Sequence, residues 1–343
     1  MSATRCYSTF RLVNGSTGDP VLYIDSPGRD NAFLFDAGDN ANLSMTELAD
    51  LDAVFISHHH VDHFIGLDRI VRANLDCDKT LQIFGPEKTI QKVYDRITSY
   101  EYQYFPFQKI ALCVHEILPD VIRTAMLECT QRFPQPVVEE TPRNGLTIYE
   151  TRDVTVEAVH VEHTVSCLAY ALTEKPGWQL DSEKLMAQGV KYGSWVNDVL
   201  IKARARVPLH SPFRVPLDCL PDGNDATQVP STLEAVLNRY FTESAGARVA
   251  FVTDTVWNES VKNAVLPLTQ GAWRLYCDCF YAKEQGAQAA KHRHMTTDNV
   301  AELAQLAGVE ELVLIHFAGR YVEAYSKLVN QVRAVFPNVT AQF

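Results

Sequence analysis

The chain lacks any long hydrophobic run. No stretch of about 18 or more uncharged apolar residues occurs in its 343 residues, so the sequence predicts no membrane span. The first residues, Met1 to Cys6, lack the apolar core of a secretory signal. The cytoplasm is therefore the expected compartment. No internal repeat or low-complexity tract is present.

Cysteine and positive charge are also scarce. The eight cysteines are too few for a disulfide scaffold, and a cytosolic chain would keep them reduced. Cys277 and Cys279 form a Cys-x-Cys pair that could bind a metal, but no second pair completes a tetrahedral site. We therefore expect Cys279 to pack within a strand. With 31 Lys and Arg against 42 Asp and Glu, the net charge is −11, so nucleic-acid contact would need a local basic patch.

What remains is the composition of a globular protein, with 46% hydrophobic and 21% charged residues. Short strands separated by turns fill the first sixty residues, and strand–helix alternation returns from about residue 248. Between these parts, we expect residues 105–144 to form a helical insertion with loops. Residues 173–245 are rich in Pro, Gly and charge and carry short helical pieces at 182–188 and 231–240. They are expected to form an arm or lid.

The run from Ser57 to His63 is the most informative motif. It has the form His-x-His-x-Asp-His and follows the apolar strand-like run 51–56. In a strand-to-helix loop, His58 and His60 can point one way while Asp62 and His63 point another. Imidazole and carboxylate suit zinc and related divalent ions, so the spacing indicates two metals side by side. A solvated cluster or a tag is the alternative, but a tag would sit at a terminus and lack the preceding strand.

Other candidate ligands stand at the ends of predicted strands. His160 and His163 follow the strand 154–159, Asp254 ends the strand 249–253, and His316 ends the strand 312–315. A single such residue is more often structural than a ligand. Several strand ends with His or Asp, beside the opening motif, indicate a shared metal centre.

These motifs resemble those of the metallo-β-lactamase-fold hydrolases, and the chain is most similar to ribonuclease Z among them. The resemblance covers nearly the whole chain. It is carried by a strand followed by Gly-Pro, a third-histidine segment, a Gly-Asp-Thr-like segment and a Thr-His-Phe-Ser-x-Arg-Tyr-like segment. These lie at Leu81–Pro86, His163–Tyr170, Thr253–Thr255 and Leu314–Tyr321.

The resemblance implies a complete ligand set for two Zn²⁺ ions, with Mn²⁺ or Fe²⁺ as alternatives. The ligands are His58, His60 and His163 for the first ion, Asp62, His63 and His316 for the second, and Asp254 as the bridge. His160 does not align, and we interpret it as a core or supporting histidine. His59 is the variable position of the motif.

The resemblance also implies a catalytic histidine at His294. The family partner is a Glu, and Asp278 stands at the aligned position with a shorter reach. A metal pair lowers the pKa of a bridging water and supplies hydroxide near neutral pH. Asp62 would accept or orient the proton of that water, and His294, supported by Asp278, would protonate the departing oxygen.

The implied fold is an α/β (α+β) four-layer αβ/βα sandwich of the metallo-β-lactamase type. It would span residues 1–343 as a single domain, with the arm or lid at about 173–245. The implied activity is that of a zinc-dependent phosphodiesterase acting on RNA, such as a tRNA 3′ precursor, or on a smaller phosphodiester. A homodimer is implied by the resemblance alone.

The chain departs from the family in its N-terminal loop, residues 14–20, which carries no basic residue. The family ties this loop, and the segment aligned with 38–41, to tRNA handling. A local basic stretch could replace it as a phosphate-binding surface, or could be an ordinary solvated loop. That stretch consists of Lys202, Arg204, Arg206 and Arg214.

Three other functions remain open. A hydrolase of the same fold could act on an aryl sulfate, a cyclic nucleotide or a lactone. A redox diiron protein would want Glu at the position of His60, which the chain lacks. A non-catalytic binding module is disfavoured because every ligand position is intact.

Overall fold

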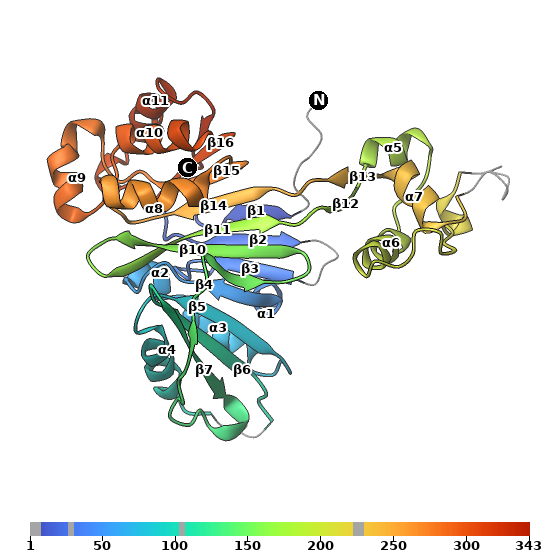
Figure 1. Cartoon of the computed structure of the whole chain (residues 1–343), viewed down its shortest axis with the longest axis horizontal. Coiled ribbons are helices and arrows are strands. Elements are labelled where there is room, and N and C mark those ends of the chain that lie inside the picture. Colours follow the sequence, from blue (N-terminus) through green and yellow to red (C-terminus); the bar gives the residue numbers. More distant parts are fainter. Residues whose placement is uncertain (1–7, 27–30, 103–106, 222–229) are drawn as a thin grey trace.

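A computed structural model describes residues 8–26, 31–102, 107–221 and 230–343. Two sheets pack face to face, and helices cover the outer face of each (Figure 1). The expectation about Met1 to Cys6 lies outside the described residues, as do parts of the 105–144 and 173–245 predictions. Within the described ranges, no helix is long and apolar enough to cross a bilayer.

The first sheet contains eight strands in sequential order. They are β1 (Thr9–Leu12), β2 (Leu22–Ser26), β3 (Asn31–Phe35), β4 (Leu51–Phe55), β5 (Thr80–Gly85), β6 (Ala111–Ile117), β7 (Val121–Glu128) and β8 (Glu139–Pro142). Its outer face packs against an apolar stripe on each of three helices. These are α1 (Met45–Ala49), α3 (Leu67–Asn74) and α4 (Thr89–Thr98), with the short α2 (Val61–Phe64) preceding α3.

The second sheet has the order β17-β16-β15-β14-β11-β10-β9. Its strands are β9 (Thr147–Glu150), β10 (Val154–Glu162), β11 (Ser166–Glu174), β14 (Arg248–Val252), β15 (Arg274–Asp278), β16 (Glu311–Ile315) and β17 (Val339–Thr340). The helices α8 (Glu259–Thr269), α10 (Thr297–Ala307) and α11 (Tyr325–Arg333) cover its outer face, and α9 (Gly286–His292) precedes α10. Cys277 and Cys279 are buried in this helix-facing core as free thiols.

Aromatic side chains fill the space between the two sheets. Phe35 lies at the centre, with its ring centroid 5.3 Å from Phe55, 5.7 Å from Tyr170 and 5.8 Å from Phe251. All four side chains are fully buried. Because these rings belong to strands of both sheets, they lock the sheets together and fix the facing edges at which the loops meet.

The expected helical insertion at 105–144 is wrong. Its described residues, 107–144, include β6, β7 and β8, which extend the first sheet. In β6, Leu112 and Val114 are buried against the helices, while Cys113 and His115 lie half-buried on the other face. The period is therefore two, but the buried Glu116 falls on the apolar face and Ile117 on the other, so the apolar–polar alternation breaks before the strand ends.

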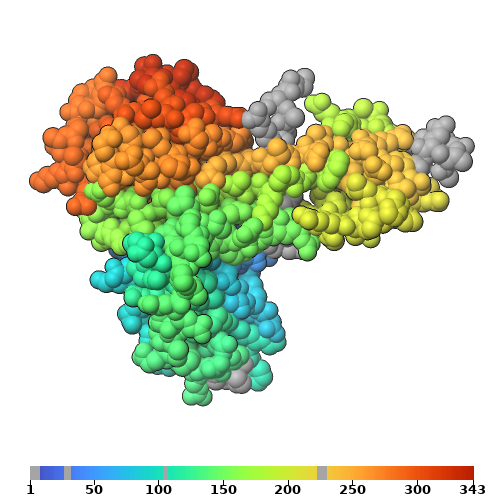
Figure 2. Space-filling view, in the orientation of Figure 1, coloured from blue at the N-terminus to red at the C-terminus, as the bar shows by residue number. Residues whose placement is uncertain are grey.

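Within the 173–245 segment, the described residues 175–221 and 230–245 form an arm that projects from the sandwich (Figures 1 and 2). A two-stranded ribbon carries three helices that enclose their own apolar core. The elements are β12 (Gly177–Leu180), α5 (Ser182–Ala187), α6 (Trp195–Arg204), α7 (Leu233–Tyr240) and β13 (Phe241–Ser244). The helical pieces at 182–188 and 231–240 match α5 and α7, whereas α6 was not predicted.

Candidate metal centre

The predicted site residues come from loops that converge at one edge of the sandwich. His58 to His63 span the turn from β4 into α2, and His163 lies between β10 and β11. Asp254 and His316 follow β14 and β16, which are parallel neighbours of β15 in the second sheet. Because the carboxyl ends of parallel strands meet at one sheet edge, residues far apart in sequence meet here.

The first group consists of His58, His60, His163 and Asp254, whose candidate ligand atoms all lie within 4.8 Å of one another. His60 Nδ1 is 2.9 Å from His58 Nε2 and 3.4 Å from His163 Nε2. The Asp254 Oδ2 atom lies 3.6 Å from His58 Nε2 and 3.7 Å from His163 Nε2. Burial lowers the pKa of His58 to about 2, so this imidazole is neutral, as a metal ligand must be.

The second group consists of Asp62, His63 and His316. Asp62 Oδ2 lies 3.1 Å from His316 Nε2 and 3.4 Å from His63 Nε2. Asp254 reaches this group too, with Oδ1 3.0 Å from His316 Nδ1 and Oδ2 3.5 Å from His63 Nε2. The Asp254 carboxylate therefore lies between the two groups, and its role as a bridging ligand stays a prediction.

The chemistry of the second group fits a bound cation. His63 Nε2 is buried and makes no hydrogen bond in the described chain, although carboxylate oxygens lie 3.4 and 3.5 Å away. Burial alone would lower the pKa of His63 and His316, but Asp254 and neighbouring carboxylates raise both well above the usual value. The carboxylates of Asp36, Asp62, Asp254 and Asp278 thus surround the two imidazoles, and a divalent cation would neutralise part of this negative charge.

A buried carboxylate that the sequence analysis did not single out supports His63. Asp36 Oδ2 accepts a hydrogen bond from His63 Nδ1 at 2.7 Å, and its two oxygens also accept from the Ser57 amide at 2.6 Å and hydroxyl at 2.8 Å. This contact fixes the ring with Nε2 facing the site. In the sequence, Asp36 is marked only as a charged residue directly after the apolar strand β3, which does not reveal its contact with His63.

His163 is held in a similar way by backbone. Its Nδ1 donates to the Arg293 carbonyl at 3.0 Å, while Arg293 Nη1 donates to the His163 carbonyl at 2.9 Å. Arg293 has φ +59°, a left-handed conformation that costs an arginine energy. Asp36, Asp254 and His316 also have positive φ, at 56°, 45° and 58°, so local backbone strain is concentrated around this site.

His294 pairs with Asp278, and both lie with Asp254 and His316 in a third set of candidate ligands that overlaps the first two. The His294 Nδ1 atom donates to Asp278 Oδ2 at 3.0 Å, and Phe280 stacks on the imidazole at 4.2 Å. Burial lowers the pKa of His294, but the fully buried Asp278 carboxylate outweighs this effect and raises it. Asp278, which stands where the family has a glutamate, is thus long enough to hydrogen-bond His294.

The structure separates the remaining histidines from the two groups. His59 Nε2 lies 2.9 Å from Thr89 Oγ1, so its ring points away from its ligand-like neighbours. His160 belongs to neither group among the described residues, and its interpretation as a core or supporting residue stays a prediction. His292 hydrogen-bonds the Tyr281 hydroxyl at the end of α9.

The fold and the two His/Asp groups define a metal-dependent hydrolase of the metallo-β-lactamase fold. Known structures agree on the fold: a metallo-β-lactamase fold protein, YhfI of Bacillus subtilis, superposes with a TM-score of 0.53 at 15% identity over 96% of this chain and 93% of that one. The short form of human tRNase Z gives a TM-score of 0.51 at 16% identity, over 92% and 93%. The predicted fold class is confirmed.

The chain belongs to the ribonuclease Z family. It is 30% identical to ribonuclease Z of Deinococcus radiodurans over 328 residues, which cover 94% of this chain and 93% of the relative. Ribonuclease Z of Methanosarcina mazei is 27% identical over 313 residues, covering 89% and 84%. A family model described as anti-Pycsar protein Apyc1 matches residues 22–173. The predicted metal-dependent phosphodiesterase of the ribonuclease Z type is confirmed.

Proposed function

We propose that the chain cuts RNA by metal-assisted hydrolysis of a phosphodiester, using two zinc ions at the two His/Asp groups. The observation that carries this proposal is the shared Asp254 carboxylate, which faces His58 and His163 on one side and His63 and His316 on the other from a buried position. His58, His60 and His163 would hold one ion, and Asp62, His63 and His316 the other. Two such ions supply a nucleophile near neutral pH and neutralise phosphate oxygens.

The chain's own residues divide the proton transfers between them. The Asp62 side chain is 41% exposed, whereas that of Asp254 is 3% exposed. Asp62 is therefore the carboxylate that an incoming water can reach, and it would orient that water and accept its proton. His294, kept protonated by Asp278, would deliver a proton to the departing oxygen of the phosphodiester.

RNA contact is proposed for the basic stretch of Lys202, Arg204, Arg206 and Arg214. The structure places Lys202 and Arg204 in α6 and the other two beyond it. In this acidic chain, such a local patch provides the phosphate contacts that the N-terminal loop does not. The homodimer, the choice of zinc over Mn²⁺ or Fe²⁺, and the cytoplasmic compartment also remain predictions.

A smaller phosphodiester is the second candidate substrate. The loop at 14–20, which the family ties to tRNA handling, makes structural contacts here instead. The Ser16 amide donates to the Gln342 carbonyl at 2.7 Å, and the Phe317 amide donates to the Ser16 carbonyl at 3.1 Å. This loop therefore anchors the C-terminal segment next to the His316 loop and has no basic side chain for tRNA.

The decisive experiment compares Asp254→Ala with an exposed-aspartate control, Asp95→Ala. Metal content is measured by mass spectrometry, and hydrolysis is followed on pre-tRNA, bis-nitrophenyl phosphate, an aryl sulfate and a lactone. We expect the control to keep two metals and to cut RNA and the small phosphodiester, and Asp254→Ala to lose both metal and activity. Full activity in Asp254→Ala would contradict the scheme, and turnover of only the sulfate or lactone would contradict the substrate class.

A further inference from the structure

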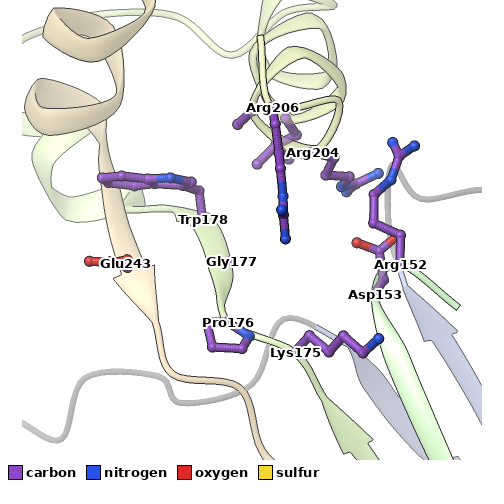
Figure 3. Close-up of a pocket in the computed structure, with 11 residues that line it drawn as sticks. Arg152, Asp153, Lys175, Pro176, Gly177, Trp178, Arg204, Arg206 and Glu243 are labelled. Atoms are coloured by element: carbon purple, nitrogen blue, oxygen red, sulfur yellow. The ribbon is translucent and has the colours of Figure 1, made fainter. Parts of the chain in front are cut away.

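A cleft of about 360 Å³ lies where the arm joins the sandwich (Figure 3). One wall comes from the turn before β10 and the residue after β11, and the other from the end of α6 and the ribbon. Such a volume is near the lower end of the roughly 300–1,000 Å³ range of small-molecule sites. The cleft therefore has room for one nucleotide unit.

The cleft is positively charged in an acidic protein. Arg152, Lys175, Arg204 and Arg206 line it, against the two carboxylates of Asp153 and Glu243. The guanidinium groups of Arg152 and Arg206 make no hydrogen bond or ion pair with any residue in the described ranges. They stand on opposite walls, and arginine is the side chain best suited to grip a phosphate.

Arg206 occupies its position at a conformational cost. It follows the end of α6 with φ +52°, the left-handed position where helices commonly carry glycine. Its side chain extends into the middle of the cleft, between Trp178 and the turn at Arg152 (Figure 3). An arginine at a position that favours glycine indicates a role for the side chain outside local folding.

Trp178 supplies an aromatic surface beside the charges. It lies in β12, is partly buried and packs against the arm core. An indole next to unpaired arginines is the combination that binds single-stranded nucleic acid, with a base stacked on the ring and a phosphate on the cations. We propose that this cleft binds one nucleotide unit, with its phosphate between Arg152 and Arg206 and its base on Trp178.

The distance to the metal centre indicates which part of a substrate the cleft would hold. Arg152 and Asp153 precede the nine-residue strand β10, and His163 follows its end. At about 3.3 Å per residue, the cleft lies roughly 30 Å from the metal centre. A stacked strand advances about 3.4 Å per nucleotide, so the unit would lie about nine nucleotides from the scissile bond. This assignment rests on the proposed RNA substrate.

The test measures binding by the full-length protein to a labelled single-stranded RNA of about 15 nucleotides, with a chelator present to prevent cleavage. Arg206→Gly is the key variant, because glycine suits the backbone there and the melting temperature should be unchanged or higher. We expect Arg206→Gly and Arg152→Ala each to raise the Kd about tenfold and to reduce the salt slope by about 0.7. Trp178→Leu should raise the Kd by a similar factor, whereas Trp178→Phe should keep most of the affinity of the unsubstituted protein.

Two controls carry the same charge change outside the cleft, Lys191→Ala on the arm and Arg72→Ala on α3, and neither should change the Kd. Equal affinities for cleft variants and controls would overturn the proposal, as would binding of neither RNA nor nucleotide by the unsubstituted protein. Repeating the titration with uridine monophosphate distinguishes a free nucleotide from a strand. If RNA is hydrolysed while cleft variants bind like the controls, only the cleft proposal fails; if the cleft binds RNA that is never cut, only the proposed function fails.

Discussion

Asp36 determines which nitrogen of His63 faces the candidate metal centre. An Asp36→Asn substitution keeps the size of the side chain but can present an amide N–H to His63 Nδ1 in place of an acceptor. The proton would then move to Nε2, the atom that must be free to bind a metal. We expect metal affinity to fall about 10- to 100-fold, with loss from the second group first. Isothermal titration with zinc measures the metal affinity of Asp36→Asn and of the control Asp95→Asn. Equal affinities of the two variants would show that Asp36 is only structural.

His115 provides a pH-dependent stability that is separate from the metal centre. Burial lowers the pKa of His115 to about 4. Its ring stacks on Phe84 with the ring centroids 4.4 Å apart, and its two nitrogens hydrogen-bond the side chains of Thr124 and Gln82. The folded state keeps His115 neutral, whereas the unfolded chain takes up a proton below pH 6.5. The contribution of His115 to the free energy of unfolding is therefore present above pH 6.5 and is lost as the pH falls toward 4. From pH 7 to 5 this corresponds to about 2 kcal/mol.

Urea unfolding at pH 7 and pH 5 checks this for His115→Gln against the unsubstituted protein at fixed metal concentration. The variant should be less stable at pH 7, and its free energy of unfolding should fall less between the two pH values. If both proteins lose the same free energy, His115 is not the titrating group.

The seven candidate ligands could be identified from sequence because each stands at the end of an apolar strand or in one short motif. Asp36 and Arg293 could not, because their roles depend on contacts with His63 and His163. His63 is 27 residues from Asp36, and Arg293 acts through its carbonyl, which every residue type possesses. Such supporting contacts become visible only when the loops are brought together.

At the scale of elements, the loop after β3 packs against the start of α2 without space for side chains. A Cβ atom added to Gly38 would lie 2.3 Å from the Asp62 carbonyl, and one added to Gly66 would lie 2.2 Å from the Gly38 carbonyl. Because these contacts are with backbone, a methyl group must displace the turn that carries Asp62 and His63. This packing fixes the second group of candidate ligands.

We therefore expect Gly38→Ala to weaken metal binding at the second group by at least about tenfold and to destabilise the fold by about 1–3 kcal/mol. Gly286→Ala is the matched control, because nothing lies within 4 Å of a Cβ there. Zinc titration and thermal unfolding of both variants check the prediction. Unchanged metal affinity in Gly38→Ala would show that the turn can move without disturbing the site.

The elements that sequence patterns missed share a physical feature. In β6 the buried Glu116 falls on the same face as Leu112 and Val114, and Ile117 falls on the other, so the apolar–polar alternation of an outer strand breaks within the element. Helix α6 buries its apolar side chains only in the small arm core, and that core also needs residues far away in the sequence, such as Tyr240. In both cases the partner surface, not the local sequence, determines the structure.

For the molecule as a whole, the arm and the sandwich bury separate apolar cores. The arm core centres on Trp195, whose ring lies 5.7 Å from Tyr240 and 6.2 Å from Phe241. Its members all come from residues 178–241, and none belongs to the cores of the sandwich. The two parts are joined by the ribbon of β12 and β13, so the sandwich does not need the arm to fill its interior.

Replacing residues 181–240 by a short Gly-containing turn that closes the ribbon tests this separation. We expect the shortened protein to fold, to bind metal and to hydrolyse bis-nitrophenyl phosphate with a kcat/KM within about threefold of the full chain, because no metal-group residue lies in the arm. Its kcat/KM on RNA should fall by at least about tenfold, since removing α6 also removes Arg204 and Arg206 from the cleft. Loss of both activities together, with metal still bound, would show that the arm shapes the metal centre itself. Equal retention of both would show that RNA reaches the centre without the arm.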